Sequence, residues 1–143
     1  MKKHAYVSLL VCGLLVGLAA SAQAQSNIKV NVPFNFTIGT TLLQAGEYTV
    51  QQASPHAASE VLLFRDAAGE SRAVMMGIRV EPSSKDTVPK LVFHRYGDIY
   101  FLSQVWLNGG DSGSELRPGS HERELLASKS TASEGVTVLA QGR

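Results

Sequence analysis

Cysteine is almost absent from this sequence, since the only one is Cys12, close to the N-terminus. The chain beyond residue 24 therefore has no disulfide, no thiolate nucleophile and no cysteine ligand for a metal. A block of basic residues is also lacking. The sequence contains no H-E-x-x-H pair and no G-x-S-x-G turn, so the usual signatures of a zinc protease and of a serine hydrolase are missing.

The first 24 residues have the pattern of a secretory signal peptide. Lys2 and Lys3 precede an apolar run over residues 7–20, and small residues at Ala22 and Ala24 form an A-x-A cleavage site. This run is shorter than the roughly 20 residues that span a bilayer. We expect cleavage after Ala24, no membrane span afterwards, and a secreted or periplasmic protein.

Residues 25–143 are expected to form a single β-rich domain. Loss of the two N-terminal lysines leaves 11 basic against 12 acidic residues, with the signs interspersed. Neither nucleic acid nor an anionic membrane surface is favoured as a partner by this balance.

Residues 91–107 hold the only tryptophan and predict a β-hairpin whose tight turn is Gly97-Asp98. With that turn, Tyr96 lies opposite Ile99 and Phe93 opposite Leu102. One predicted face carries Leu91, Phe93, Arg95, Tyr100, Leu102, Gln104 and Trp106, and the other Val92, His94, Tyr96, Ile99, Phe101, Ser103, Val105 and Leu107. Both faces are mostly apolar. We therefore expect a central hairpin whose second face is covered by another sheet, by a helix or by a partner chain.

Period-two alternation over residues 28–38 predicts a strand, and Pro33 indicates that this strand lies at a sheet edge or that Pro33 faces an unpaired side. Further strands are expected at 47–52, 61–66, 71–80 and 136–140. In the long strand 71–80, the expected inward residues are Val74, Met76, Ile78 and Val80. A short helix is expected to begin with Ser120 as its N-cap. The pattern predicts an all-β fold, an antiparallel β-sandwich or small barrel of about seven or eight strands with one short C-terminal helix.

Several segments resemble a group of small exported bacterial proteins, of acidobacterial type, whose function is uncharacterised. The segments are V-P-F-N-F at 32–36, L-Q-A-G-E-Y-T-V at 43–50, L-V-F at 91–93, Y-F-L-S at 100–103, V-W at 105–106, and Ser120 with Glu122 and Arg123. Gln44 stands where that group usually has proline. The resemblance implies a secreted β-rich protein with no established activity, and it carries over no site residues.

The chain has residues that could form an active site or a metal site. A hydrolase-like enzyme would use His94, Asp98 or Glu122, at least two of which would have to meet in a concave site. A metal site would have to draw on His56, His94 and His121, which lie in three distant segments without a short-spaced pair. The sequence favours neither, and we expect no cofactor, no metal and no catalytic residue.

Tyr96, Tyr100 and Trp106 are the candidate ligand-binding residues, because aromatic faces bind sugars and flat apolar molecules. The alternative is that these side chains belong to the core. The leading hypothesis is a non-enzymatic binding or structural module of the envelope or exterior, with a protein or a small ligand as its partner. The alternatives are the hydrolase-like enzyme, and a barrel that carries a small apolar ligand in a cavity lined by Phe93, Leu102 and Trp106.

Overall fold

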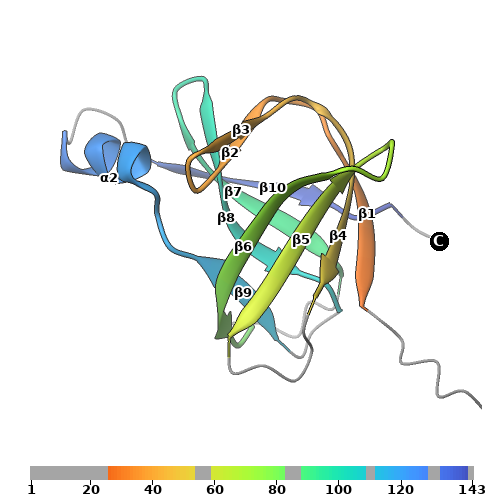
Figure 1. Ribbon diagram of the computed structural model, residues 1–143. Helices are drawn as coiled ribbons and strands as arrows, with labels where there is room; N and C mark the ends of the chain where they lie inside the picture. The colour runs from red at the N-terminus through yellow and green to blue at the C-terminus, as the bar shows by residue number, and fades with distance from the viewer. Residues whose placement is uncertain (1–25, 54–58, 83–87, 109–111, 129–132, 142–143) are drawn as a thin grey trace, which may run out of the picture.

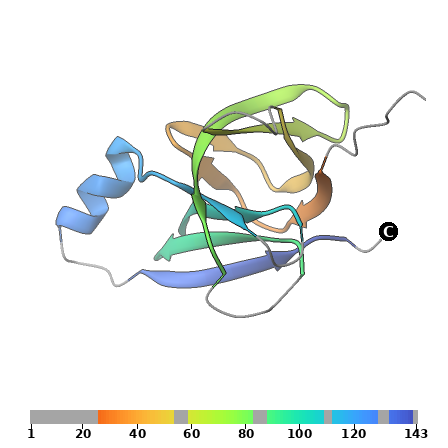
Figure 2. The same ribbon diagram turned by 90° about the horizontal axis from the view of Figure 1, so that it is seen from below.

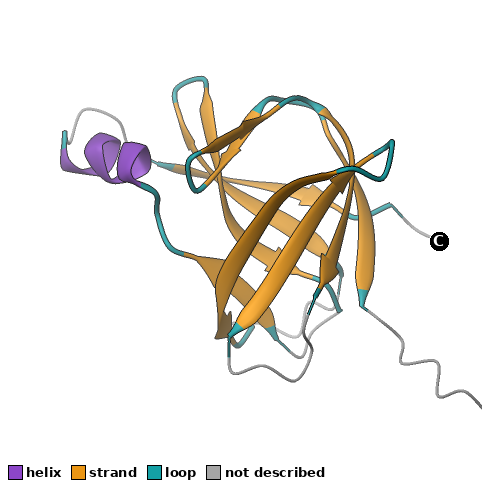
Figure 3. Ribbon diagram, in the orientation of Figure 1, coloured by secondary structure: helices purple, strands orange, loops and turns teal. Residues whose placement is uncertain are grey.

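A computed structural model describes residues 26–53, 59–82, 88–108, 112–128 and 133–141. The predicted signal peptide and His56 lie outside these ranges. The described chain forms a 10-stranded sheet and one helix (Figures 1 and 3). The elements are β1 Asn27–Val32, β2 Phe36–Ile38, β3 Thr41–Leu43, β4 Gly46–Gln52, β5 Glu60–Asp66, β6 Ser71–Val80, β7 Lys90–Tyr96, β8 Ile99–Trp106, β9 Gly113–Leu116, α2 Ser120–Ala127 and β10 Glu134–Leu139. The prediction of a mostly β fold with one short helix is confirmed.

The sheet runs in the order β1-β4-β5-β6-β9-β8-β2-β3, and β8 also pairs with β7, which in turn pairs with β10. Its pairings are antiparallel except at one point, where β2 runs parallel to β8. The sheet is open, because β1 and β10 are not paired as strands. They nevertheless approach each other, since the Gln141 amide donates to the Lys29 carbonyl at 2.8 Å. The two views show a strongly curved sheet with α2 on one side of it (Figures 1 and 2).

The concave side of the sheet holds the hydrophobic core. Three of the largest side chains that are fully buried come from strands far apart in sequence: Phe36 of β2, Phe64 of β5 and Phe93 of β7. Phe93 meets Phe34 and Phe36 edge to face, with ring centroids 5.2 and 5.3 Å apart. A domain without disulfides is thus held by one packed aromatic and aliphatic interior.

The central hairpin has the predicted turn and the predicted pairing near it. Tyr96 pairs with Ile99 and Phe93 with Leu102, and Gly97 has the positive φ of 62° that this turn requires. The predicted faces are wrong beyond that point, because a bulge lets Ser103 enter without a partner between Leu102 and Gln104. The extra residue reverses the alternation, so Val105 lies in the core and Trp106 lies outside the core cluster.

Pro33 divides the strand predicted over residues 28–38. β1 ends at Val32, two bends follow, and β2 begins at Phe36. Phe34 in the break stacks on Tyr100 at a centroid distance of 3.8 Å. The predicted edge position is confirmed for β1, which pairs only with β4. Proline cannot donate a ladder hydrogen bond, and here it separates two strands that pair with different partners.

The inward face predicted for β6 is wrong. Val74, Met76 and Ile78 are 61%, 64% and 50% exposed, and the side of β6 that faces inward carries Ala73, Met75 and Gly77. A Cβ on Gly77 would lie 2.7 Å from the Ser114 Cβ, so β9 passes too close for any larger residue. Gly77 leaves room for β9 on the inward side, and Val74, Met76 and Ile78 point outward.

Three further features differ from the sequence prediction. β3 and β9 were not expected, and β9 includes Gly113 and Ser114 from a segment that reads as a glycine-rich connection. Helix α2 is present, but its N-cap is Gly119 and Ser120 is its first residue. A Cβ on Gly119 would lie 2.2 Å from the Gly39 carbonyl oxygen, so the close approach of two backbones requires glycine here.

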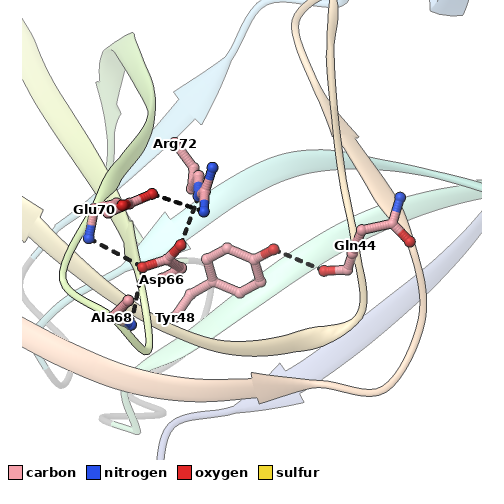
Figure 4. Close-up of polar contacts among 6 residues, drawn as sticks. All are labelled: Gln44, Tyr48, Asp66, Ala68, Glu70 and Arg72. Carbon is pink, nitrogen blue, oxygen red and sulfur yellow. Dashed lines mark hydrogen bonds and ion pairs between the residues drawn. The ribbon is translucent and has the colours of Figure 1, made fainter.

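Asp66 organises the turn between β5 and β6 (Figure 4). Its carboxylate accepts from the backbone amides of Ala68 and Glu70, each at 3.0 Å, and from Arg72 Nε at 2.6 Å. The Arg72 hydrogen bond is the main reason that the pKa of Asp66 is below its ordinary value. Nearby, the Tyr48 hydroxyl donates to the Gln44 carbonyl at 2.7 Å. These contacts fix the turn and engage both oxygens of the Asp66 carboxylate.

Candidate functional site

Helix α2 covers part of the second face of the central hairpin. Glu122 is 3% exposed, and its Oε1 lies 2.8 Å from His94 Nδ1 and 3.3 Å from the Tyr96 hydroxyl, which donates to it. Beside them, the His121 ring meets Phe101 edge to face at 5.7 Å. We call His94, Tyr96 and Glu122 the helix-anchoring cluster, because these contacts attach α2 to β7.

Burial raises the pKa of the Tyr96 hydroxyl, and the Glu122 carboxylate raises it further. Both effects disfavour the phenolate, since ionisation would place a second negative charge beside a buried carboxylate. Tyr96 is therefore a hydrogen-bond donor to Glu122 over the whole physiological range.

Tyr96→Phe should reduce the free energy of unfolding by about 1 kcal/mol at neutral pH, the typical net value of one hydrogen bond. Above pH 10.0, the ordinary tyrosine pKa, unfolded Tyr96 ionises while folded Tyr96 stays protonated. The unfolded state then binds fewer protons, so the wild type loses stability as pH rises and the difference between the two proteins shrinks. Urea titrations across this range measure it, and a difference that stays constant above pH 10 would contradict the assignment. Burial also raises the pKa of Tyr48, so Tyr48 contributes to the pH dependence that remains in the variant.

The structure brings together two of the three residues of the enzyme hypothesis. His94 and Glu122 are in contact, whereas Asp98 is exposed in the hairpin turn. Within the described residues no group of three or more His, Asp or Glu is placed to hold a metal ion. A histidine oriented by a buried carboxylate is the arrangement of a general base. Such a base still needs a nucleophile and a substrate site.

The three aromatic candidates do not form one surface. Tyr96 is buried under α2, and Trp106 packs against Gly113, where a Cβ would lie 2.7 Å from the indole. Tyr100 is half-buried, stacks on Phe34 and packs against the core. Trp106 is outside the core cluster that contains Phe93 and Leu102, so these three side chains do not line one interior.

A buried polar cluster that sequence reasoning missed lies where β5, β6 and β9 meet. The Glu60 carboxylate accepts a hydrogen bond from the Ser114 hydroxyl and another from Arg79 Nε at 3.2 Å. Glu60 and Ser114 are both buried, while Arg79 extends into solvent. Every carboxylate oxygen therefore has a donor, and the cluster ties β9 to the β5–β6 hairpin.

The outer face of β5 and β6 is the most unusual surface of the described chain. Antiparallel pairing places Val61 beside Met76 and Leu63 beside Val74 on this face, and Ile78 continues the row. We call Val61, Leu63, Val74, Met76 and Ile78 the outer aliphatic face. The strands β5 and β6 form the front layer in Figure 1, and α2 lies away from them. Val74, Met76 and Ile78 of this row are exposed, whereas soluble monomers rarely expose a contiguous apolar patch, so the row is a candidate contact surface.

Charged residues stand at the two ends of the outer aliphatic face. Arg65 follows Leu63 at the end near the Asp66 turn, and Glu115 pairs with Ile78 at the other end. Neither forms an ion pair within the described ranges, and Arg65 Nε is buried without a hydrogen-bond partner. No sequence signal identified this surface, because its residues alternate as a core strand would.

No protein-family model, no curated protein and no solved structure matches this chain. None of the helices in the described part of the chain has the length and apolar character to cross a bilayer.

Proposed function

We propose that this is an exported, non-enzymatic protein that works as a binding or structural module of the cell envelope or its exterior. We further propose that it makes contact through the outer aliphatic face. The observation that carries this proposal is the exposure of Val74, Met76 and Ile78, which are each at least half exposed on one strand.

Water is an unfavourable environment for this face. A sheet covered on one side only is expected to alternate apolar inward and polar outward residues. β5 and β6 depart from that rule on the outward side, while Leu62 and Phe64 already complete the core on the inward side. Burying apolar surface contributes about 25 cal/mol per Å². A partner that covers five aliphatic side chains therefore gains more there than at a mixed surface.

The finer architecture that fits this role is a small barrel. The approach of β10 to β1, through the Gln141–Lys29 hydrogen bond, supports it over a sandwich of two separate sheets. The approach of the two end strands shields part of the edges that could otherwise recruit other chains. Specific binding then uses the outer surface of the sheet and not a strand edge.

Export rests on the N-terminal pattern, and the envelope or exterior is where we propose that the protein acts. The resemblance to small exported acidobacterial proteins agrees with that location. A domain without cysteine is compatible with an oxidising compartment, because no thiol is present to oxidise there.

Site-specific photocrosslinking in exporting cells tests the proposed contact. A photoreactive amino acid at position 76 should give a covalent adduct, because Met76 is 64% exposed at the centre of the face. The same amino acid at position 139 is the matched control, since Leu139 is also apolar and 59% exposed but lies on β10. Adducts at 76 and not at 139 support the proposal. No adduct at 76, or equal adducts at both positions, would exclude it.

A second candidate function is favoured by the His94–Glu122 contact of 2.8 Å. In that case the protein is a small hydrolase-like enzyme in which His94 removes a proton from water and Glu122 orients the ring. Turnover of ester or glycoside substrates that disappears in His94→Gln, with the fold intact, would establish this function and overturn the non-enzymatic one. Equal rates for the variant and the wild type would exclude it.

A further inference from the structure

We propose that the outer aliphatic face is covered by a second copy of this chain in a two-fold symmetric dimer. In this dimer Arg65 of each subunit lies opposite Glu115 of the other. The inference rests on the proposed function, because it names the partner of the same face.

The order of residues across the face gives it two ends of opposite charge. The pairs Leu63–Val74 and Val61–Met76 lie in the middle, and the Ile78–Glu115 pair follows them. Arg65 lies beyond Leu63 at the opposite end. The aliphatic residues are therefore bounded by a cation at one end and an anion at the other.

A two-fold axis between two packed faces makes these ends complementary. When the axis is perpendicular to the line from Arg65 to Glu115, the rotation exchanges the two ends. Each subunit then presents its Arg65 to the other subunit's Glu115, so the interface contains two identical ion pairs around one shared apolar centre. Self-complementarity of this kind is what an isologous interface requires. Sheets packed face to face about 10 Å apart can interdigitate their side chains.

Both charged residues are available for such a pair. Neither Arg65 nor Glu115 has an ionic partner in the part of the chain that the structure describes. Arg65 is partly buried, and its own chain covers its Nε without supplying an acceptor, so the guanidinium forms no charge-assisted bond within the described chain. An anionic membrane would select cations alone at the boundary of an apolar patch. One cation and one anion at the ends of the outer aliphatic face fit a second copy of the chain better than they fit an anionic membrane.

Charge reversal tests this arrangement on the purified protein by sedimentation velocity over a concentration series. The wild type should form a dimer, and Met76→Glu should raise its Kd about a hundredfold. Arg65→Glu and Glu115→Arg alone should each raise the Kd roughly tenfold, because each creates two like-charge contacts. The double variant R65E/E115R should return the Kd to within about threefold of the wild type, because the two pairs form again with their signs exchanged.

Leu139→Glu is the control for introducing a glutamate at an exposed apolar site, and it should leave the dimer unchanged. Circular dichroism and the Tm verify that each variant is folded.

A wild type that stays monomeric overturns the inference, as does a dimer that tolerates Met76→Glu. Single charge variants that the double variant fails to rescue overturn the predicted contact. A monomer that still gives adducts at position 76 in cells would assign the face to another molecule, and the proposed function would then stand without this inference. A monomer that floats with lipid vesicles only when Met76 is intact would assign the face to a membrane.

Discussion

Replacing Phe93 with alanine should reduce the free energy of unfolding by about 3–5 kcal/mol, the usual cost of removing a buried phenylalanine. Phe93 is fully buried, and its ring lies edge to face with those of Phe34 and Phe36. The surrounding residues come from the break between β1 and β2 and from β2, β8 and β10, which the sheet holds in place, so they can close over the cavity only partly. Since a domain of this size has only about 5–15 kcal/mol of stability, the variant should lose a large part of it.

Urea unfolding followed by circular dichroism measures this effect. Leu42→Ala is the matched control, because Leu42 is 64% exposed on β3 and its truncation should change the free energy of unfolding by no more than about 0.5 kcal/mol. Equal effects of the two substitutions would show that Phe93 is not at the centre of the core.

The second large effect is expected at Glu122. Glu122→Ala removes the acceptor shared by His94 and Tyr96 and leaves the buried Tyr96 hydroxyl with only its hydrogen bond to Ser133. Loss of a buried charged acceptor costs roughly 2–3 kcal/mol. Glu122 also lies in the first turn of α2, where a negative charge is favourable for the helix. We therefore expect α2 to separate from the hairpin before the sheet unfolds.

Hydrogen exchange on the α2 amides measures this separation, and urea unfolding measures the total loss. Glu124→Ala is the control, because Glu124 belongs to the same helix but is exposed. A double-mutant cycle with Tyr96→Phe should give a coupling energy of about 1 kcal/mol. Additive effects would show that the Tyr96–Glu122 hydrogen bond does not stabilise the fold.

The local features of this fold could be predicted from the sequence where a short-range rule applies. The Gly97-Asp98 turn fixes the register of β7 against β8, so Tyr96–Ile99 and Phe93–Leu102 follow from counting outward. The bulge at Ser103 could not be predicted in this way, because counting outward from the turn assumes an unbroken alternation. One inserted residue was enough to exchange the places of Val105 and Trp106.

The face of β6 shows the limit of alternation as a guide. Val74, Met76 and Ile78 alternate with Ala73, Met75 and Gly77, and both sets are apolar. Hydrophobicity alone would place the set with Val74, Met76 and Ile78 in the interior. The other set faces inward instead, because Gly77 lies against Ser114 and leaves no room there for a larger side chain. β9 itself has no apolar run that would reveal it. The functional proposal therefore depends on a contact between strands that a single sequence does not display.

The helix-anchoring cluster was predicted only in part. His94 and Glu122 were recognised as chemically capable residues, but they are 28 positions apart and nothing in the sequence pairs them. Their contact shows that α2 covers part of the second face of the central hairpin. Asp98 was grouped with His94 by proximity in sequence, and the turn holds it in solvent.

The two adjacent methionines test the central claim most directly, because one faces the core and the other belongs to the proposed contact face. The sequence has three methionines, and the predicted cleavage removes Met1, so the methyl spectrum of methionine-labelled protein should show two signals. In dilute protein a soluble nitroxide should broaden the Met76 signal and spare that of Met75. At higher concentration the second copy should protect Met76 as well. A Met76 signal that stays equally broadened at every concentration would contradict the second copy as the partner of the face, and a Met75 signal that broadens first would contradict the face itself.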